Sequence, residues 1–236
     1  MFTYSLVLLF SLAVPVIRSF ERKHIHFIGK MPHLLPATLV MALVFIVWDV
    51  LFTRWGVWGF NDDYLLGLKI LGLPIEEILF FFVIPYVCLF SYEVLNYFIH
   101  KDLLGKAAPY ITGLLLIFCV VLLIKFPGRL HTLWSAFSAV LLLAWVGIAW
   151  RPVWLGRFYL MFGVILVPFI LVNGVLTGSF LGNVVVYYNE AHIIGTRILT
   201  IPMEDTVYGF AMLLMTTALY EWFRNRAGVS PWSEAR

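Results

Sequence analysis

Charge is scarce in this chain. Charged residues make up 12% of the 236 residues, whereas 62% are apolar. Soluble domains carry roughly 25% charged residues, so the composition excludes an ordinary water-soluble domain. Apolar windows of about 20 residues, long enough to cross about 30 Å of hydrocarbon, begin near residues 2, 31, 75, 108, 130, 158 and 203. The sequence therefore predicts an all-α integral membrane protein with about seven transmembrane helices.

Motifs for cofactors and metals are also missing. The chain has two cysteines, Cys88 and Cys119, which fall inside predicted spans without C-x-x-C spacing, so they indicate neither a disulfide nor a metal site. It contains no G-x-G-x-x-G, no P-loop and no H-E-x-x-H. The histidines show no ligand spacing. We therefore expect no metal and no cofactor.

Lys and Arg residues are divided unequally between the two ends of the predicted spans. One face receives Arg18, Arg22, Lys23, Lys30, Lys101, Lys106, Arg151, Arg157, Arg224, Arg226 and Arg236; the other receives Arg54, Lys69, Lys125, Arg129 and Arg197. The positive-inside rule predicts a multi-pass protein of the cell membrane with a cytoplasmic C-terminus and an N-terminus outside. The net charge of +3 then reflects topology, and no nucleic-acid partner is expected.

What the chain does contain is a repeat at a constant offset of 128 residues. The matching positions include Asn61 and Asn189, Pro74 and Pro202, Glu76 and Glu204, Glu77 and Asp205, and Tyr92–Glu93 and Tyr220–Glu221. We predict a first repeat over residues 1–100, a spacer helix over 101–128 and a second repeat over 129–236. Because one spacer helix makes the two three-helix repeats parallel, both Pro-x-Glu-acid motifs should lie on one face of the membrane and share a cavity.

The acids of the two motifs have two interpretations. Each motif follows a proline in the first helical turn, where the helix dipole favours negative charge, so the acids could simply start helices. However, adjacent side chains lie about 100° apart around a helix, so at least one of each pair should face protein or hydrocarbon. Ionisable groups inside a membrane protein are expensive and are functional candidates. We take Glu76 and Glu204 as the first candidates for function, and Glu77 and Asp205 as the second.

Further polar residues fall near the same level. Asp49 and Asn173 lie near the ends of the helices that precede the motifs, one helical turn apart when compared at the repeat offset. Asn61 and Asn189 are of a type that more often forms turns than sites.

Two cations precede the motif acids. Lys69 and Arg197 could pair with these acids, or could extend along the apolar surface to reach water. Both interpretations remain open. The Tyr-Glu pairs lie toward the cytoplasmic ends of their helices, where a structural role is expected.

These residue types suit proton transfer in an apolar cavity. A carboxylic acid kept neutral by burial can protonate a weakly basic substrate, while a second carboxylate stabilises the resulting cation or removes a proton. Aromatic faces also stabilise cations, and 17% of the chain is aromatic.

Two segments carry a resemblance to a known family. They are "FNDDYLLGLKILGLPIEEILFFFVIPY" in the first half and "NEAHIIGTRILTIPMEDTVYGF" in the second. In this tandem arrangement the chain resembles the membrane-embedded lycopene cyclases of the heterodimeric or fused type, found in some bacteria, archaea and fungi. The resemblance covers essentially the whole chain. It implies carotenoid ring closure without a flavin, and it places Glu76, Glu77, Glu204 and Asp205 in the acid site.

The implied reaction is an acid-catalysed, non-redox isomerisation of lycopene to γ- or β-carotene. A carboxyl group protonates C2 of the terminal C1=C2 bond, the C5=C6 bond attacks C1, and loss of the C6 proton from the C5 cation gives a β-ring. The cavity must shed water, which would otherwise capture the cation. The acid is Glu76 or Glu204, and the carboxylates of the opposite half act as stabiliser and base.

Two other functions also use some of these features. A small proton-coupled transporter also uses repeats and buried carboxylates, but here the acids cluster at helix ends and neither half has a broken central helix. A non-catalytic carotenoid-binding subunit is disfavoured because one chain carries both motifs. The expected partners are lycopene or a related acyclic carotenoid and the lipid bilayer, with a homo-oligomer left open.

Overall fold

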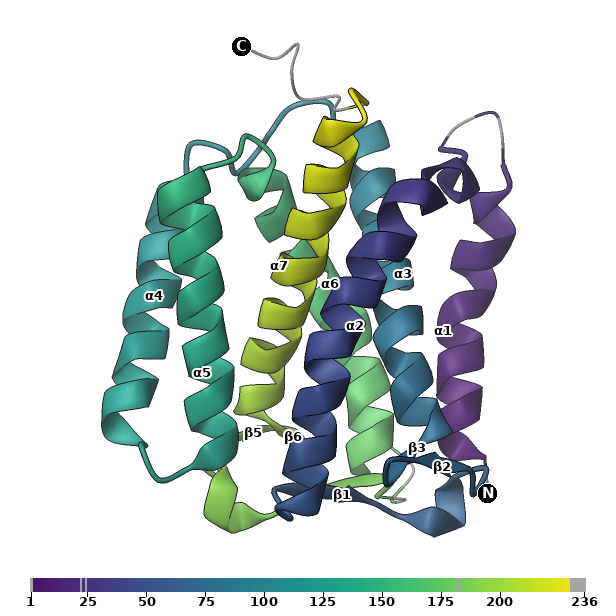
Figure 1. Ribbon diagram of the computed structural model, residues 1–236, viewed down its shortest axis with the longest axis vertical. Helices are drawn as coiled ribbons and strands as arrows, with labels where there is room; N and C mark the ends of the chain where they lie inside the picture. Colours follow the sequence, from purple (N-terminus) through teal and green to yellow (C-terminus); the bar gives the residue numbers. More distant parts are fainter. Residues whose placement is uncertain (1, 22, 24, 181, 183, 230–236) are drawn as a thin grey trace.

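The computed structural model describes residues 2–21, 23, 25–180, 182 and 184–229. Arg22 and Arg236, two cations used in the topology prediction, lie outside these residues. Seven α-helices form a bundle in the described part of the chain (Figure 1). They are α1 (Thr3–Ser19), α2 (Met31–Arg54), α3 (Ile75–Phe98), α4 (Ala108–Lys125), α5 (Leu130–Leu142), α6 (Leu155–Thr177) and α7 (Met203–Arg226), with a 3₁₀ turn at Phe27–Lys30 and a π-helix at Leu143–Trp150 that continues α5. The predicted all-helical membrane fold is confirmed.

Five helical segments of the described chain are long and apolar enough to cross a membrane. They are Phe27–Arg54, Ile75–Phe98, Ala108–Lys125, Leu130–Trp150 and Leu155–Thr177. The helix α1 is apolar but has only 17 residues. The helix α7 has 24 residues and carries buried polar side chains, among them Thr216, Thr217 and Glu221. The chain is therefore a multi-pass membrane protein.

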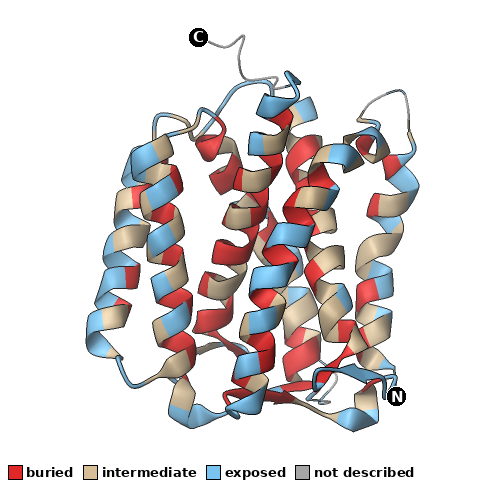
Figure 2. Ribbon diagram, viewed as in Figure 1, coloured by how far each residue is buried: buried red, intermediate tan, exposed pale blue. Residues whose placement is uncertain are grey.

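The helix α7 runs through the interior of the bundle. Buried residues follow it along most of its length (Figure 2), because α2 and α5 pack extensively against it. A helix covered by protein need not present an apolar surface to lipid, which explains why α7 can carry more polar side chains than the other helices.

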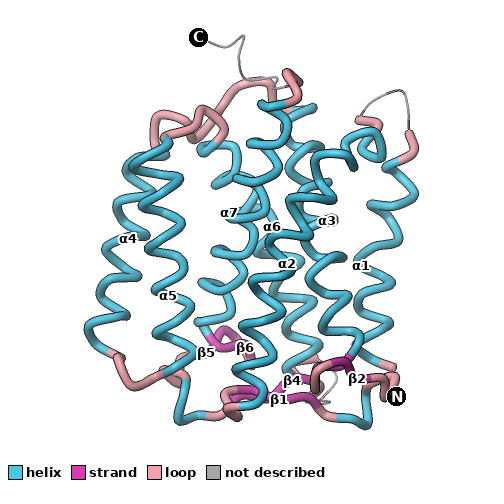
Figure 3. The backbone as a smooth tube through the Cα atoms, in the orientation of Figure 1, coloured by secondary structure: helices cyan, strands magenta, loops and turns pink. Residues whose placement is uncertain are grey.

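The strands gather at one end of the bundle, near the N-terminus, while the C-terminal end of α7 lies at the other (Figure 3). The strand β1 (Trp58–Phe60) pairs with β4 (Val186–Tyr188) in an antiparallel ribbon that joins the two halves of the chain. Short hairpins precede α3 and α7: β2 (Lys69–Ile70) with β3 (Leu73–Pro74), and β5 (Arg197–Ile198) with β6 (Ile201–Pro202). A two-residue turn joins the strands of each hairpin.

The two halves repeat the same local structure. The order α2, β1, 3₁₀ turn (Asp62–Tyr64), β2, β3, α3 matches α6, β4, 3₁₀ turn (Glu190–His192), β5, β6, α7. The side chain of Asn61 accepts the Asp63 N–H at 3.1 Å, and that of Asn189 accepts the Ala191 N–H at 3.0 Å. Both asparagines therefore form turns, as their residue type favours.

At the opposite end, the Tyr-Glu pairs exchange partners between the halves. The hydroxyl of Tyr92 donates to Glu221 at 2.9 Å, and that of Tyr220 donates to Glu93 at 2.8 Å. Arg224 donates to Glu93 at 2.7 Å. All five side chains are buried, so this network ties α3 to α7. Its charged side chains therefore have a structural role.

Candidate active site

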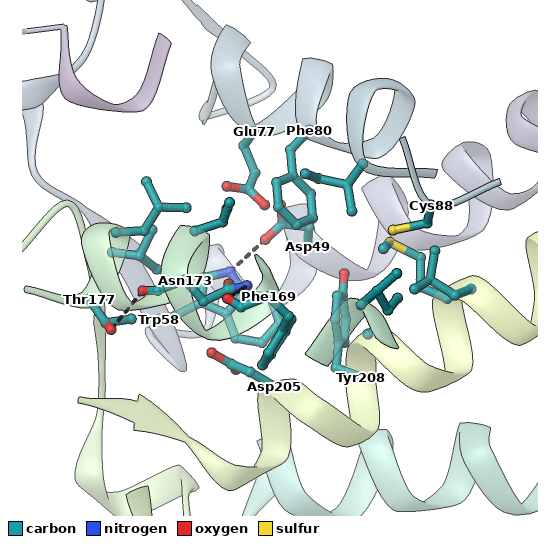
Figure 4. Close-up of a pocket in the computed structure, with 18 of the residues that line it drawn as sticks. Asp49, Trp58, Glu77, Phe80, Cys88, Phe169, Asn173, Thr177, Asp205 and Tyr208 are labelled. Carbon is teal, nitrogen blue, oxygen red and sulfur yellow. Dashed lines mark hydrogen bonds between the residues drawn. The ribbon is translucent and has the colours of Figure 1, made fainter. Parts of the chain in front are cut away.

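A cavity of about 130 Å³ lies at the strand-bearing end of the bundle. Side chains of α1, α2, α3, α5, α6 and α7 line it, and alternate residues of the β1–β4 ribbon cover it. Its polar lining consists of Tyr4, Asp49, Trp58, Glu77, His131, Asn173, Thr177, Tyr188, Asp205 and Tyr208. The remaining lining is dominated by aliphatic and phenylalanine side chains, some of which are drawn in Figure 4. The site is an apolar cavity that contains three carboxyl groups.

Helix ends bring these three carboxyl groups together. Asp49 lies in the penultimate turn of α2, while Glu77 and Asp205 are the third residues of α3 and α7. Because α3 and α7 begin at the same end of the bundle, the first-turn acids from the two halves face one cavity (Figure 4). Trp58 Nε1–H donates to Asp49 Oδ1 at 2.5 Å, and the Tyr4 hydroxyl donates to Glu77 Oε2 at 2.5 Å.

Asp205 has two side-chain partners. His131 Nε2 lies 2.9 Å from Asp205 Oδ1, and the Tyr188 hydroxyl donates to Asp205 Oδ2 at 2.7 Å. Burial, followed by the neighbouring charge of Asp205, raises the pKa of Tyr188 well above its usual value. Tyr188 therefore stays protonated and remains a hydrogen-bond donor to Asp205.

Glu76 lies outside the cavity lining and anchors the loop before α3. Its Oε1 accepts the Leu66 N–H at 2.7 Å and the Ser5 hydroxyl at 3.2 Å. The side chain is fully buried. In the first motif, one carboxyl group thus faces the loop and the next faces the cavity, as the 100° separation along a helix allows.

Glu204 repeats this arrangement in the second half. Its Oε1 accepts the Ile194 N–H at 2.6 Å and the Thr132 hydroxyl at 2.6 Å. Like Glu76, it is buried and outside the cavity lining. The sequence ranked Glu76 and Glu204 first as candidate acids; that role stays a prediction, and the geometry favours their neighbours.

The other residues singled out from the sequence divide into two groups. Asp49 and Asn173 line the cavity together, and Asn173 Nδ2–H donates to the Phe169 carbonyl at 3.2 Å. Asn61 and Asn189 are not among the cavity-lining residues and form the turns described above.

The two cations pair with loop acids instead of motif acids. Lys69 Nζ lies 2.7 Å from Asp62, and Arg197 donates to Glu190 at 2.5 Å. Both pairs are at least partly exposed. In each pair the acid precedes the cation by the same number of residues in the sequence. They brace the hairpins that precede α3 and α7.

Six polar cavity residues escaped the sequence analysis: Tyr4, His131, Trp58, Thr177, Tyr188 and Tyr208. The first two correspond to each other at an offset of 127, because Tyr4–Ser5 holds Glu77 and Glu76 as His131–Thr132 holds Asp205 and Glu204. The gap-free offset of 128 misses this correspondence. Among the described residues, no group of three or more His, Cys, Asp or Glu side chains is arranged to hold a metal ion.

Comparison with known proteins gives two matches. A family model described as lycopene cyclase matches residues 1–95 and 128–223. The bifunctional lycopene cyclase/phytoene synthase of Aspergillus niger is 36% identical over 53 residues, which make up 22% of this chain and 9% of that protein. The matched segment thus spans less than a tenth of the length of this relative. No solved structure matches the chain.

Proposed function

The chain belongs to the lycopene cyclase family, and from this we propose that it closes the acyclic ends of lycopene, or of a related carotenoid, inside the membrane. The observation that carries the proposal is the set of three carboxyl groups, Asp49, Glu77 and Asp205, in one apolar cavity. An apolar cavity of about 150 Å³ binds benzene, so about 130 Å³ is close to the space that an unsubstituted six-membered ring needs.

Glu77 is the acid of the proposed reaction. It lies in the cavity beside two further carboxyl groups, and a buried carboxyl group near other carboxylates favours its neutral, proton-donating form. Its proton is transferred to C2 of the C1=C2 bond, which leaves a cation at C1. The C5=C6 π electrons then form the C1–C6 bond, and the positive charge moves to C5.

Asp205 is the base. It removes the C6 proton, the C6–H electron pair becomes the new C5=C6 bond, and the product is a β-ring. One proton is gained and one is lost, so the carotenoid is isomerised without a redox step. The enzyme would then be an intramolecular lyase or isomerase.

The cation intermediates need an environment that stabilises charge without supplying water. Trp58, Tyr188 and Tyr208 line the cavity, and aromatic faces attract cations, most strongly where water is excluded. The β1–β4 ribbon covers this end of the cavity. Water exclusion protects the cation from capture.

Glu76 and Glu204 have a different role in this proposal. Their hydrogen bonds to backbone N–H groups fix the loops that enter α3 and α7, and thereby the direction of Glu77 and Asp205. The division into repeats over residues 1–100 and 129–236, with a spacer over 101–128, belongs to the same proposal: each repeat supplies one acid to the shared cavity.

The purified chain, reconstituted into liposomes that contain lycopene, tests the proposed function. We expect a product of unchanged mass whose absorption and retention time match those of γ- or β-carotene, without added flavin or nicotinamide. Liposomes without protein are the control. Lycopene recovered unchanged from liposomes that contain folded protein would refute the proposal.

A further inference from the structure

The two halves of the site differ in the partner of the cavity acid. Glu77 is held by the phenol of Tyr4, whereas the equivalent Asp205 is held by the imidazole of His131. Only the imidazole can accept a proton near neutral pH. The two halves of the site are therefore chemically unequal at the partner of the cavity acid.

His131 is fixed in place. Its side chain is buried, Nε2 lies 2.9 Å from Asp205 Oδ1, and Nδ1 lies 3.3 Å from Ser135 Oγ. The imidazole ring packs edge-on against the Trp58 ring, with 5.0 Å between the ring centroids, and nearly parallel to the Tyr188 ring, with 5.8 Å between the centroids. Both ring nitrogens have partners, so the imidazole has one preferred orientation.

We propose that His131 is a positioning residue that holds Asp205 in its carboxylate form and so makes the second half the basic side of the site. This inference rests on the proposed cyclisation and deepens it by assigning unequal roles to the halves. Because an imidazole can take up a proton, this pair can carry opposite charges, and an Nε2–H of a charged imidazole stabilises the carboxylate more than the N–H of a neutral amide would. Ser135 contacts His131, and His131 in turn contacts Asp205, so this chain of contacts orients the carboxyl group. Metal-bound histidines are oriented in the same way by the partner of their second ring nitrogen.

The consequence is control over the position of the ring double bond. The C5 cation can lose a proton from C6, from C4 or from the methyl group on C5, and each loss gives a different ring isomer of the same mass. A base must lie within hydrogen-bond reach of the proton it removes. Because His131 and Tyr188 hold the two oxygens of Asp205, the carboxylate has a fixed orientation in the cavity and can favour one of these protons.

Other titratable groups surround this pair. Asp49 from α2, Glu77 from α3, Tyr4 from α1, Tyr188 from β4 and Tyr208 from α7 face the same cavity. Of the cavity-lining side chains, His131 is the one that combines a basic nitrogen with a bond to a motif acid. The basic side is therefore assigned to α5 and α7.

The variant His131→Gln tests the proposal, because glutamine can still donate a hydrogen bond but is not basic. We expect turnover of lycopene to fall by about 10²-fold, at the lower end of the contribution of general acid–base catalysis, and the remaining product to contain a different ratio of ring isomers. His33 lies in the first turn of α2, at the end of the helix opposite Asp49. His33→Gln is therefore the matched control and should behave as wild type. An unchanged rate with unchanged isomers in His131→Gln would overturn the proposal.

Infrared spectroscopy without substrate separates this proposal from the proposed function. His131→Gln should show an additional carbonyl stretch of a protonated carboxylic acid, and His131→Gln/Asp205→Asn should lose it. This result is independent of whether the protein cyclises lycopene. Absence of the additional band would contradict the role of His131 even in an active cyclase.

If His131→Gln does not fold, Ser135→Ala replaces it in both measurements. This variant keeps the imidazole but removes its Nδ1 partner. A smaller shift of the isomer ratio in the same assay supports the proposal, and a ratio equal to wild type opposes it.

Discussion

Neighbouring carboxyl groups have different surroundings in each motif. Glu76 accepts a hydrogen bond from a backbone N–H of the preceding loop. Glu77 faces the cavity and accepts a hydrogen bond from the phenol of Tyr4. The second motif divides its acids in the same way. A carboxyl group held by backbone donors is a structural anchor, whereas one in an apolar cavity beside other acids can exchange a proton with a substrate.

Replacing the anchors should therefore lower stability more than it alters chemistry. Glu76→Ala leaves the Leu66 N–H and the Ser5 hydroxyl without their acceptor, and because both bonds are only partly buried the cost should be about 0.5–1.5 kcal/mol for each bond. Thermal unfolding in detergent should shift to lower temperature, with ring isomers unchanged. Glu204→Ala should shift thermal unfolding in the same direction.

Glu76→Gln is the matched control, since its amide oxygen can still accept both bonds. It should melt and cyclise nearly as wild type does. Loss of activity in Glu76→Gln at an unchanged melting temperature would return the role of acid to Glu76.

At the scale of elements, the β1–β4 ribbon is the outer cover of the cavity. Trp58, Phe60, Val186 and Tyr188 point into the cavity, so Gly59 and Tyr187 lie on the other face of the ribbon. Gly59 is paired directly with Tyr187, and a Cβ added to Gly59 would come within 2.5 Å of the Tyr187 ring. The ribbon therefore joins the two halves in one fixed register.

A disulfide across the ribbon tests this arrangement. In Gly59→Cys/Tyr187→Cys the two residues are directly opposite in an antiparallel pair, where Cα atoms lie about 4.5–5.5 Å apart, within the roughly 4.4–6.8 Å that a disulfide spans. The clash with the tyrosine ring is removed. We expect the crosslink to form on mild oxidation, as measured by mass spectrometry. The two native cysteines are buried, and Tyr187→Cys alone, which adds no Cβ at Gly59, serves as the control.

The crosslinked protein should still convert lycopene. The side chains that line the cavity are unchanged, and an apolar substrate dissolved in the bilayer has no need to pass the ribbon. Conversion that stops on oxidation and returns on reduction would show that the ribbon must open.

The elements also show what the sequence could and could not predict. Hydropathy and the 128-residue offset predicted seven helices and placed the motifs at one end. They could not predict which acid of each motif faces the cavity, because packing sets the rotation of α3 and α7. His131 was missed for two reasons. Its counterpart, Tyr4, is a different residue type, and the two residues are 127 positions apart instead of 128.

At the scale of the whole molecule, two halves enclose one site and are joined at both ends. The ribbon and the acids lie at one end, and the exchanged Tyr-Glu pairs with Arg224 lie at the other. α7 lies between α2 and α5 and carries Asp205, Tyr220 and Glu221. The shared cavity therefore depends on both repeats being present.

The distribution of Lys and Arg predicts how this molecule is oriented in the membrane. A reporter fused after Arg226 should lie in the cytoplasm, and one inserted between Trp55 and Leu73 should lie outside. Fusions of an enzyme active on only one side of the membrane measure this. Both reporters on the same side would refute the seven-span topology.

The central claim is that an acid facing the cavity, and not its neighbour on the same helix, protonates the carotenoid. Turnover of lycopene by purified Glu77→Gln in liposomes, measured beside Glu76→Gln, tests it most directly. We expect Glu77→Gln to lose about 10²-fold or more in turnover while its melting temperature is unchanged, and Glu76→Gln to remain active. Turnover near the wild-type rate in Glu77→Gln would contradict it.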